Sequence, residues 1–393
     1  MKLGIYGGAF NPPHAGHIRA AAYGAKVLGL EKVLLIPTNI SPHKATPQNT
    51  ASAKNRLEML EISIAGQENL QVNDMEIARG GQSYTYETLL QIRQICPGEK
   101  PVLFMGTDMF LTLLQWRNPQ IILKNAEIGV FYRGDREEKS KIAQQAEKVQ
   151  QLGAVVHLIE NPVTQISSTV LRSLLVFGSA GDYLQPGVED YIRKEGLYGT
   201  GKCYRNLSLK ELEEAVSAFI KPERMAHVLG CRDMALELAK KWGADQEKAQ
   251  RAALLHDITK ALDGPVQLTL CQSLGILLDD FSKENPKTLH AFTGSLVAER
   301  IFGETEEVVQ AIASHTTGKP GMNTLDQIIY IADMMEPTRT YPGVEKVRSL
   351  AFENLEEAVK LGLSNTIENL KSREEGIHPD GLATLTWFHE RKR

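Results

Sequence analysis

The spacing of apolar residues changes character once along this chain of 393 residues. In the first half, short apolar runs such as residues 32–36, 102–105 and 128–132 alternate with segments of helical periodicity. In the second half almost every segment has helical spacing. Alternating strands and helices favour a doubly wound parallel sheet, whereas purely helical spacing favours a helical domain. The sequence therefore predicts a Rossmann-like α/β domain followed by an all-α domain.

The stretch 199–206 holds two glycines and shows no periodicity. We therefore expect it to be the linker between the two regular regions. After it, Ser208 and Glu211 form the Ser-x-x-Glu pattern that is typical of a capped helix N-terminus. We therefore expect one domain over residues 1–200 and a second over residues 206–393.

Charge and cysteine content narrow the classes of partner and compartment. The 44 Lys and Arg residues are outnumbered by 48 Asp and Glu residues, so the chain lacks the basic field that nucleic-acid binding requires. No apolar run approaches the roughly 20 residues that cross a bilayer. The four cysteines form no Cys-x-x-Cys pair and follow no signal peptide. We expect a cytoplasmic protein that binds neither nucleic acid nor membrane. The oligomeric state stays open.

A turn rich in glycine and histidine follows the first apolar run, with the sequence Gly-Gly-Ala-Phe-Asn-Pro-Pro-His-Ala-Gly-His from Gly7 to His17. Gly7 and Gly8 let the main chain approach a nucleotide closely. We expect a helix to begin at His17, so that its free N–H groups face an anion such as a triphosphate. His14 and His17 could then stabilise charge that grows on the phosphates. A pair of surface histidines is the alternative that this motif alone leaves open.

A second anion-binding pattern, Ile-Ser-Ser-Thr-Val-Leu-Arg, stands at residues 166–172 after the last strand of the first half. Hydroxyl groups at a helix start, followed by Arg172, can bind phosphate, although an ordinary helix cap beside a surface arginine has the same pattern. The two motifs together resemble the adenylyltransferases of the HxGH superfamily. Within it, residues 1–200 are similar to bacterial nicotinate-mononucleotide adenylyltransferases. The segments that carry this resemblance are 37–44, 83–86 and Gly106-Thr-Asp108 with Trp116.

The resemblance implies roles for individual residues of this chain. The residues implied to bind ATP are Gly7, Gly8, Phe10, His14, His17, Gly106, Asp108, Ile166, Ser167 and Arg172. Those implied to take part in catalysis are His14, His17, Asp108 and Arg172. Those implied to bind the mononucleotide are Lys44, Thr85 and Trp116. Asn11 stands where this family commonly has Asp, so no role that needs a carboxylate is expected there.

The implied reaction is attack of the mononucleotide phosphate on the α-phosphorus of ATP, with release of pyrophosphate and with Mg²⁺ on the phosphates. Catalysis would rest on positioning and electrostatics. The choice between nicotinate and nicotinamide mononucleotide stays open. Phosphopantetheine adenylyltransferases share both anion-binding motifs but lack the Ser-Tyr-Thr and Asp/Trp elements. They are the alternative for this half.

Six polar residues of the second half lie on or at the end of expected helices, in otherwise apolar surroundings: His227, His256, Asp257, His290, His315 and Asp333. Buried polar groups need a partner, and a metal ion can be that partner, although each residue alone could be a hydrogen-bonded core residue. Imidazoles and carboxylates suit one or two octahedral ions such as Fe, Mn, Co or Mg. Asp257 could bridge two ions, which would activate a water for attack on phosphorus.

The order His, His-Asp, His, His, Asp resembles the HD superfamily, and specifically its YqeK-type branch, over residues 205–390. This resemblance implies that the six residues are metal ligands and that diadenosine tetraphosphate is cleaved to two ADP. Lys260, Arg339 and Lys346 are expected near the polyphosphate, or else are surface charges. Other HD proteins act on deoxynucleoside triphosphates, cyclic nucleotides or guanosine alarmones. A regulatory module that binds a nucleotide without hydrolysis is a further alternative. The prediction for the whole chain is a fusion of two enzymes.

Overall fold

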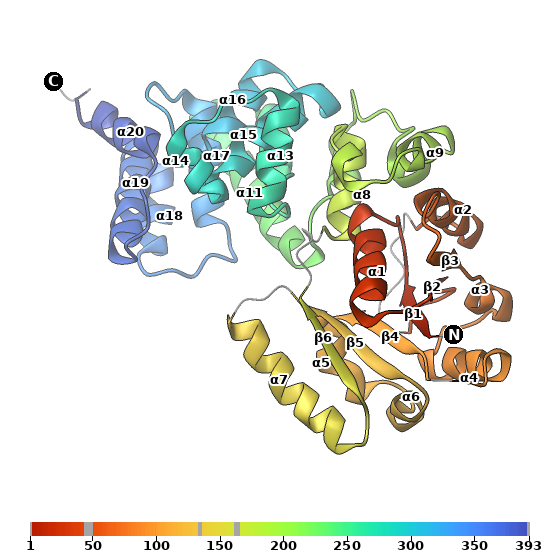
Figure 1. The fold of residues 1–393 in the computed structure, drawn as a ribbon. Helices are drawn as coiled ribbons and strands as arrows, with labels where there is room; N and C mark the ends of the chain where they lie inside the picture. The colour runs from red at the N-terminus through yellow and green to blue at the C-terminus, as the bar shows by residue number, and fades with distance from the viewer. Residues whose placement is uncertain (1, 43–49, 99, 133–135, 161–165, 391–393) are drawn as a thin grey trace. The chain divides into compact units, whose positions relative to one another are not determined.

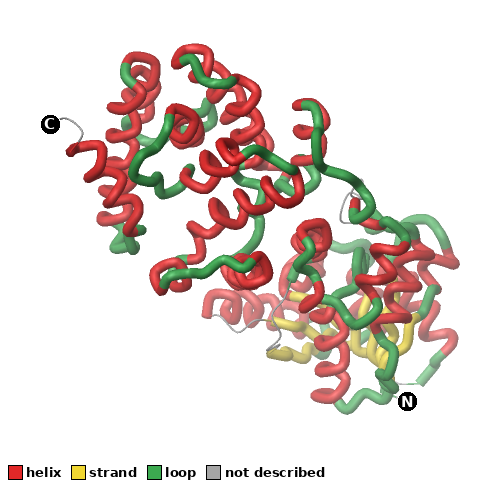
Figure 2. The backbone as a smooth tube through the Cα atoms, turned by 90° about the horizontal axis from the view of Figure 1, so that it is seen from above, coloured by secondary structure: helices red, strands yellow, loops and turns green. Residues whose placement is uncertain are grey.

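The computed structural model describes residues 2–42, 50–98, 100–132, 136–160 and 166–390. Contacts between Cα atoms divide the chain into two compact units, Met1–Lys202 and Cys203–Arg393. The strands lie in the first unit, and the described part of the second unit consists of helices and loops (Figures 1 and 2). The predicted succession of an α/β fold and a helical fold is confirmed.

The first unit is built on a six-stranded parallel sheet with the order β3-β2-β1-β4-β5-β6. Its strands are β1 (Leu3–Gly8), β2 (Lys32–Pro37), β3 (Leu70–Val72), β4 (Val102–Gly106), β5 (Glu127–Tyr132) and β6 (Val156–Glu160). The sequence pattern missed β3, because three residues are too few to show a periodicity. The order reverses between β1 and β4, as in other doubly wound sheets.

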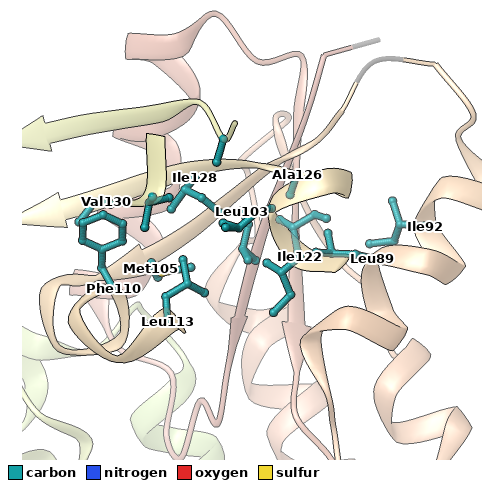
Figure 3. Close-up of a cluster of buried hydrophobic side chains, with 14 of the residues drawn as sticks. Leu89, Ile92, Leu103, Met105, Phe110, Leu113, Ile122, Ala126, Ile128 and Val130 are labelled. Atoms are coloured by element: carbon teal, nitrogen blue, oxygen red, sulfur yellow. The ribbon is translucent and has the colours of Figure 1, made fainter. Parts of the chain in front are cut away.

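Helices cover both faces of this sheet (Figure 1). They are α1 (Ala15–Leu28), α2 (Ala53–Ser63), α3 (Met75–Arg79), α4 (Thr85–Ile95), α5 (Thr107–Thr112), α6 (Pro119–Asn125), α7 (Arg136–Gln151), α8 (Ser168–Phe177) and α9 (Val188–Lys194). One buried cluster joins α4, α5, α6 and α7 to the sheet, as Figure 3 shows for Leu89, Phe110 and Ile122. A second cluster joins α1 and α2 to the sheet through residues such as Ala21 and Leu60. The sheet is therefore buried on both faces, as parallel sheets require.

The second unit is a bundle of helices around a core of its own. Its helices are α10 (Leu209–Val216), α11 (Pro222–Trp242), α12 (Gln246–Leu255), α13 (Gly264–Leu274), α14 (Asp280–Glu284), α15 (Leu289–Val297), α16 (Glu306–Ser314), α17 (Thr324–Met335), α18 (Val344–Glu353), α19 (Leu355–Ser372) and α20 (Pro379–Glu390). Helix α11 packs against both α12 and α17, and α16 packs against α12, α15 and α17. Ser208 and Glu211 form the expected capping box of α10. Within the described ranges, no helix has both the length and the apolar character to span a bilayer.

Candidate functional sites

The glycine turn lies at the point where the strand order of the sheet reverses. Gly8 and Gly106 end two neighbouring parallel strands, β1 and β4, and therefore lie at the same edge of the sheet. Ligands of doubly wound folds bind in the crevice at this edge. The fold thus brings the turn after β1 and the segment Gly106-Thr-Asp108 together, although about 100 residues separate them in sequence.

Helix α1 begins at Ala15, two residues earlier than predicted, and His14 is its N-cap residue. The rings of His14 and His17 stack with their centroids 3.5 Å apart. The His14 backbone N–H donates to Nδ1 of His17 over 3.3 Å. Because Nδ1 of His17 accepts, a neutral His17 ring carries its proton on Nε2 and can donate it to a phosphate oxygen. The earlier helix start places both histidines at the positive end of α1.

Burial keeps both of these histidines neutral. It lowers the pKa of His14 to about 4. Burial, together with the neighbouring His14, lowers the pKa of His17 well below its ordinary value. Nδ1 of His14 is buried and makes no hydrogen bond to the described residues. A buried polar atom without a protein partner is a candidate contact for a bound ligand. Phe10, in the left-handed region at φ 46°, packs its ring edge-on against His17.

Asn11 is the anchor of the glycine turn. Its amide NH₂ donates to the Thr50 hydroxyl over 3.2 Å. Its amide oxygen accepts from the Ala51 N–H over 3.1 Å and from the Tyr198 hydroxyl over 2.9 Å. A carboxylate could accept but could not donate in this position. The amide therefore has a structural role, in keeping with the expectation that no carboxylate acts here.

The second predicted motif lies directly against the first. Arg172 donates from Nη1 to the main-chain oxygen of Asn11 over 2.8 Å and from Nη2 to the Thr169 hydroxyl. The Ser168 hydroxyl donates to the main-chain oxygen of Pro12 over 3.3 Å. Ser167 caps α8 by accepting from the Val170 N–H, while the preceding Ile166 is buried. Arg172 thus holds the shape of the glycine turn.

Arg56 is a further residue of this site that the sequence prediction missed. Its side chain is buried in the middle of α2. It donates from Nη1 to the Ala9 carbonyl over 2.9 Å and from Nη2 to the Asn39 carbonyl over 3.4 Å, so it ties together the chain after β1 and the chain after β2. A signal was present in the sequence, because Arg56 has helical spacing with the buried Met59 and Leu60.

The residues expected to bind the mononucleotide lie on separate segments of the first unit. Thr85 is the first residue of α4, and Trp116 follows the short 3-10 helix Leu113–Gln115. The half-buried indole of Trp116 donates to the Thr112 hydroxyl over 3.3 Å. Beside it in sequence, the guanidinium of Arg117 lies 4.5 Å from the ring centroid of Tyr84. Asp108 is exposed in the first turn of α5. Lys44 lies outside the described residues.

In the second unit, the six predicted ligands converge from five segments of the bundle. One group forms around His227 and His256, whose Nε2 atoms lie 3.3 Å apart. Oδ1 of Asp333 lies 3.2 Å from Nε2 of His227. Oδ2 of Asp257 lies 3.3 Å from Nε2 of His256 and 3.6 Å from Nε2 of His227. We call these four residues the first ligand group.

A second ligand group is formed by His290, His315 and the other oxygen of Asp257. The Nε2 atoms of the two histidines lie 3.2 Å apart. Oδ1 of Asp257 lies 3.5 Å from Nε2 of His290 and 3.8 Å from Nε2 of His315. Asp257 therefore faces one ligand group with each of its carboxylate oxygens.

All four imidazoles are oriented by a hydrogen bond at Nδ1. The acceptors are Glu336 for His227 at 3.0 Å, the Ala253 carbonyl for His256 at 2.7 Å, the Lys287 carbonyl for His290 at 2.8 Å and the Ile312 carbonyl for His315 at 2.6 Å. A carbonyl only accepts, so Nδ1 carries the proton and the lone pair of Nε2 faces the ligand group. Facing lone pairs repel unless a hydrogen-bond donor or a cation lies between them. The Thr316 hydroxyl lies 3.2 Å from Nε2 of His290 and 3.1 Å from Nε2 of His315. This donor set fits divalent metal ions.

The pKa shifts of His227 and Asp333 also indicate a site that favours cations. Burial alone would lower the pKa of His227, but hydrogen bonds to Asp257, Asp333 and Glu336 raise it to about 9. Burial would raise the pKa of Asp333, yet the neighbouring histidines and Arg339 hold it below its ordinary value. The centre thus stabilises positive charge among its carboxylates. Burial lowers the pKa of His315, in the second group, to about 4.

Basic side chains surround the carboxylates. Nε of Arg224 donates to Oδ2 of Asp257 over 2.5 Å, Nζ of Lys260 lies 2.9 Å from Nε2 of His290, and Arg339 pairs with Asp333. A cavity of about 290 Å³ opens onto the centre, and Lys221, Arg224 and Lys260 are among its lining residues. Lys346 is exposed in the first turn of α18.

Sequence reasoning missed four residues at this centre. Arg224 and Lys221 belong to the cavity. Glu336 lies three residues after the predicted ligand Asp333, but the sequence did not predict that it would be buried. Sγ of Cys231 lies 3.6 Å from Nε2 of His227, one helical turn along α11. Cys231 and His227, together with His256 and Asp333, place four possible ligand atoms within 4.8 Å of one another.

Two family models match the chain: a cytidylyltransferase-like family over residues 5–174 and the HD domain over residues 224–338. A symmetrical bis(5'-nucleosyl)-tetraphosphatase of Halalkalibacterium halodurans is 41% identical over 172 residues, which are 44% of this chain and 91% of the relative. A probable nicotinate-nucleotide adenylyltransferase of Desulfatibacillum aliphaticivorans is 34% identical over 218 residues, covering 50% of this chain and 100% of the relative.

A crystal structure of a predicted HD superfamily hydrolase involved in NAD metabolism, from Clostridium acetobutylicum, is 33% identical, with a TM-score of 0.46 over 47% of this chain and 98% of that chain.

Proposed function

The chain belongs through its first half to the nicotinate-nucleotide adenylyltransferases and through its second half to the HD-domain symmetrical bis(5'-nucleosyl)-tetraphosphatases, and from this premise we propose that it is a bifunctional enzyme. Its first unit makes nicotinate adenine dinucleotide from ATP and nicotinate mononucleotide. Its second unit hydrolyses diadenosine tetraphosphate and related symmetrical dinucleotides to nucleoside diphosphates. The observation that carries the proposal is the presence of two chemically different sites, the histidine-containing turn at the start of α1 and the cluster of histidines and carboxylates in the second unit.

In the adenylyl transfer, a phosphate oxygen of the mononucleotide forms a bond to the α-phosphorus of ATP while the bond to pyrophosphate breaks. The neutral His17 supports this step by donating from Nε2 to the phosphate chain, at the positive end of α1. Asn11, Arg56 and Arg172 hold the turn in shape. Mg²⁺ accompanies ATP as part of the substrate. Rate enhancement then comes from positioning and from charge stabilisation.

The adenylyl acceptor decides between the proposed activity and its alternative. The full chain is incubated with ATP, Mg²⁺ and, in separate reactions, nicotinate mononucleotide, nicotinamide mononucleotide or phosphopantetheine. We expect pyrophosphate release with nicotinate mononucleotide at a kcat/KM well above the other two. Turnover of phosphopantetheine alone would overturn the assignment.

For the hydrolase we propose a centre of two divalent ions, which the two ligand groups would hold, with Asp257 contributing one oxygen to each group. Each ion would take two histidines and one oxygen of Asp257, and the ion in the first ligand group would also take Asp333. When bound, such ions supply Lewis-acid stabilisation of phosphate oxygens and lower the pKa of water. Fe, Mn, Co and Mg all suit this donor set. The opposed lone pairs of the Nε2 atoms support this proposal.

The residues around the centre bind and orient the polyphosphate. Lys221, Arg224 and Lys260 line the cavity and offset the charge of the phosphate chain. Arg339, held by Asp333, contributes a further positive charge. Water oxygen forms a bond to one central phosphorus, the bond to the other half of the substrate breaks, and two ADP result.

Product analysis tests the hydrolase directly. The metal-loaded chain is incubated with diadenosine tetraphosphate, and we expect ADP as the nucleotide product. Formation of ATP with AMP would overturn symmetrical cleavage. Release of tripolyphosphate from deoxynucleoside triphosphates, without action on the dinucleotide, would favour the triphosphatase alternative. Binding of the dinucleotide without hydrolysis, together with a changed transferase rate, would favour a regulatory module.

We place the enzyme in the cytoplasm, a compartment that its four free cysteines suit.

A further inference from the structure

The four histidines of the second unit differ in what orients them. Nδ1 of His227 rests on a carboxylate, Oε1 of Glu336, at 3.0 Å, whereas each of the other three rests on a main-chain carbonyl. Glu336 is fully buried. It follows Met335, the last residue of α17, so it is placed by the same helix as the ligand Asp333. His227 therefore has a partner of a kind that the other ligands lack.

Glu336 is itself fixed in place. Its carboxylate accepts from the Thr338 N–H over 2.7 Å and from the Thr338 hydroxyl over 2.5 Å. On α11, Gly230 leaves room for it, because a Cβ at this position would lie 2.7 Å from Oε2 of Glu336. A carboxylate bonded to Nδ1–H fixes the imidazole ring and makes Nε2 a more basic ligand. The local structure is thus built to strengthen His227 as a metal ligand.

The second ligand group differs from the first in three respects. It offers three protein ligands, His290, His315 and Oδ1 of Asp257, against four in the first group. Its histidines are oriented by neutral carbonyls. Nζ of Lys260 lies 2.9 Å from Nε2 of His290, so an ion that binds there must displace or tolerate a positive charge beside a ligand nitrogen. The cations at the first group, Arg224 and Arg339, pair instead with carboxylate oxygens, whose negative charge offsets theirs.

We propose that Glu336 and Lys260 make the two metal positions unequal, so that the first ligand group holds a tightly bound ion and the second an exchangeable one. Glu336 is a positioning residue, because it acts through His227. Lys260, which also lines the polyphosphate cavity, weakens the second position through its positive charge. With fewer protein ligands, an ion at the second position would leave more of its coordination to water and to a phosphate oxygen. This inference rests on the two-ion centre of the proposed function.

Metal titration of the full chain tests the inequality. The chain is stripped of metal and titrated with Mn²⁺ by isothermal calorimetry, and with Co²⁺ by visible absorption. We expect two classes of site. E336Q keeps the shape but removes the charge, and we expect it to raise the Kd of the tight class by about 10- to 100-fold and to change the weak class less than about twofold. E304Q is the matched control, since Glu304 is buried in the same unit but pairs with Arg251.

Two further variants keep the test decisive if E336Q folds poorly. T338V removes one hydrogen bond to the carboxylate, and we expect a smaller rise in the Kd of the tight class. K260M removes the charge beside His290, and we expect the weak class to tighten at least about fivefold while the tight class stays unchanged. An unchanged weak class in K260M would overturn the role given to Lys260.

A single class of equal sites in the wild-type chain would overturn the inequality, as would an E336Q variant in which both classes weaken equally. The proposed function fails in a different way. If the wild-type chain with both classes filled leaves diadenosine tetraphosphate intact, the hydrolase assignment is wrong, while the measured inequality of the metal positions stands.

Discussion

Both units build their site from buried histidines, yet different groups surround these histidines. In the first unit, burial lowers the pKa of His14 to about 4, and its ring stacks on His17. In the second unit, surrounding carboxylates raise the pKa of His227 to about 9, whereas burial lowers the pKa of His315 to about 4. The partners, rather than the residue type, decide what the site attracts. The carboxylate-lined centre favours cations. The turn at the positive end of α1 favours an anion.

The largest contrast is expected on removal of metal. Treatment with EDTA followed by gel filtration should lower the hydrolysis of diadenosine tetraphosphate at least roughly 10³-fold, because both water activation and charge stabilisation depend on the ions. Added Mn²⁺ or Co²⁺ should restore it. Adenylyl transfer, assayed with fresh Mg²⁺, should return to its original rate. Hydrolysis that survives complete chelation would contradict the account of the second site.

The pH dependence of stability should separate the units next. The folded-state pKa of His14 is about 4 against an ordinary 6.5, so the unfolded chain binds more protons between these values. The contribution of a neutral His14 is complete above pH 6.5 and is lost as the pH falls towards 4. At about 1.4 kcal/mol per pKa unit, this loss is about 3 kcal/mol for the first unit.

Urea unfolding can measure this loss in a W242F/W387F background, where Trp116 is the remaining tryptophan of the three in the chain. H14N cannot gain a charge, so the free energy of unfolding of the first unit should depend less on pH in this variant. H157N is the control, since His157 is half-buried beside Glu127. Equal acid sensitivity of H14N and the wild-type chain would refute the burial argument.

The sequence predicted most of the strands and the cluster of polar residues well, because both appear in it as local patterns of apolar and polar residues. Strands such as β4 and β5 were placed to within a residue or two, because buried parallel strands form continuous apolar runs. The six predicted ligands could be recognised as a group, since polar residues such as Asp333 interrupt apolar helices, and the structure brings their side chains close together. Their division into two groups could not be predicted. It depends on how α12, α15, α16 and α17 pack, which helical periodicity does not specify.

Other features lay beyond sequence reasoning for a different reason. The role of Asn11 depends on Thr50, Ala51 and Tyr198, which join it only in the folded chain. Glu336 looks like an ordinary residue after a helix, and only the folded structure buries it against His227. Long-range hydrogen bonds of this kind leave no local pattern.

Arg56 offers a finer test of how the first site is held. R56M removes two hydrogen bonds, to the carbonyls of Ala9 and Asn39. The expected loss of about 1–2 kcal/mol corresponds to a fall of about tenfold in the kcat/KM for ATP. Hydrolysis by the second unit should not change. R93M is the control, because Arg93 donates to the carbonyl of Gly98 on an exposed helix end. Equal effects of the two variants would remove Arg56 from the site.

The smallest effect is expected at Trp116. If its indole stacks on the pyridine ring, W116A should raise the KM for nicotinate mononucleotide about three- to tenfold and leave the KM for ATP unchanged. W116F keeps an aromatic face and should lie between W116A and the wild-type chain. A rise in the KM for ATP alone would place Trp116 at the other substrate.

The central claim is that one chain carries two separate active sites, and a crossed assay of two variants tests it most directly. H17A and D257A are prepared in the full chain, and each is assayed for adenylyl transfer and for hydrolysis of diadenosine tetraphosphate. We predict that H17A loses roughly 10²- to 10³-fold in transfer and D257A at least roughly 10³-fold in hydrolysis, each keeping the other activity within about twofold. Loss of both activities in either variant would contradict the claim.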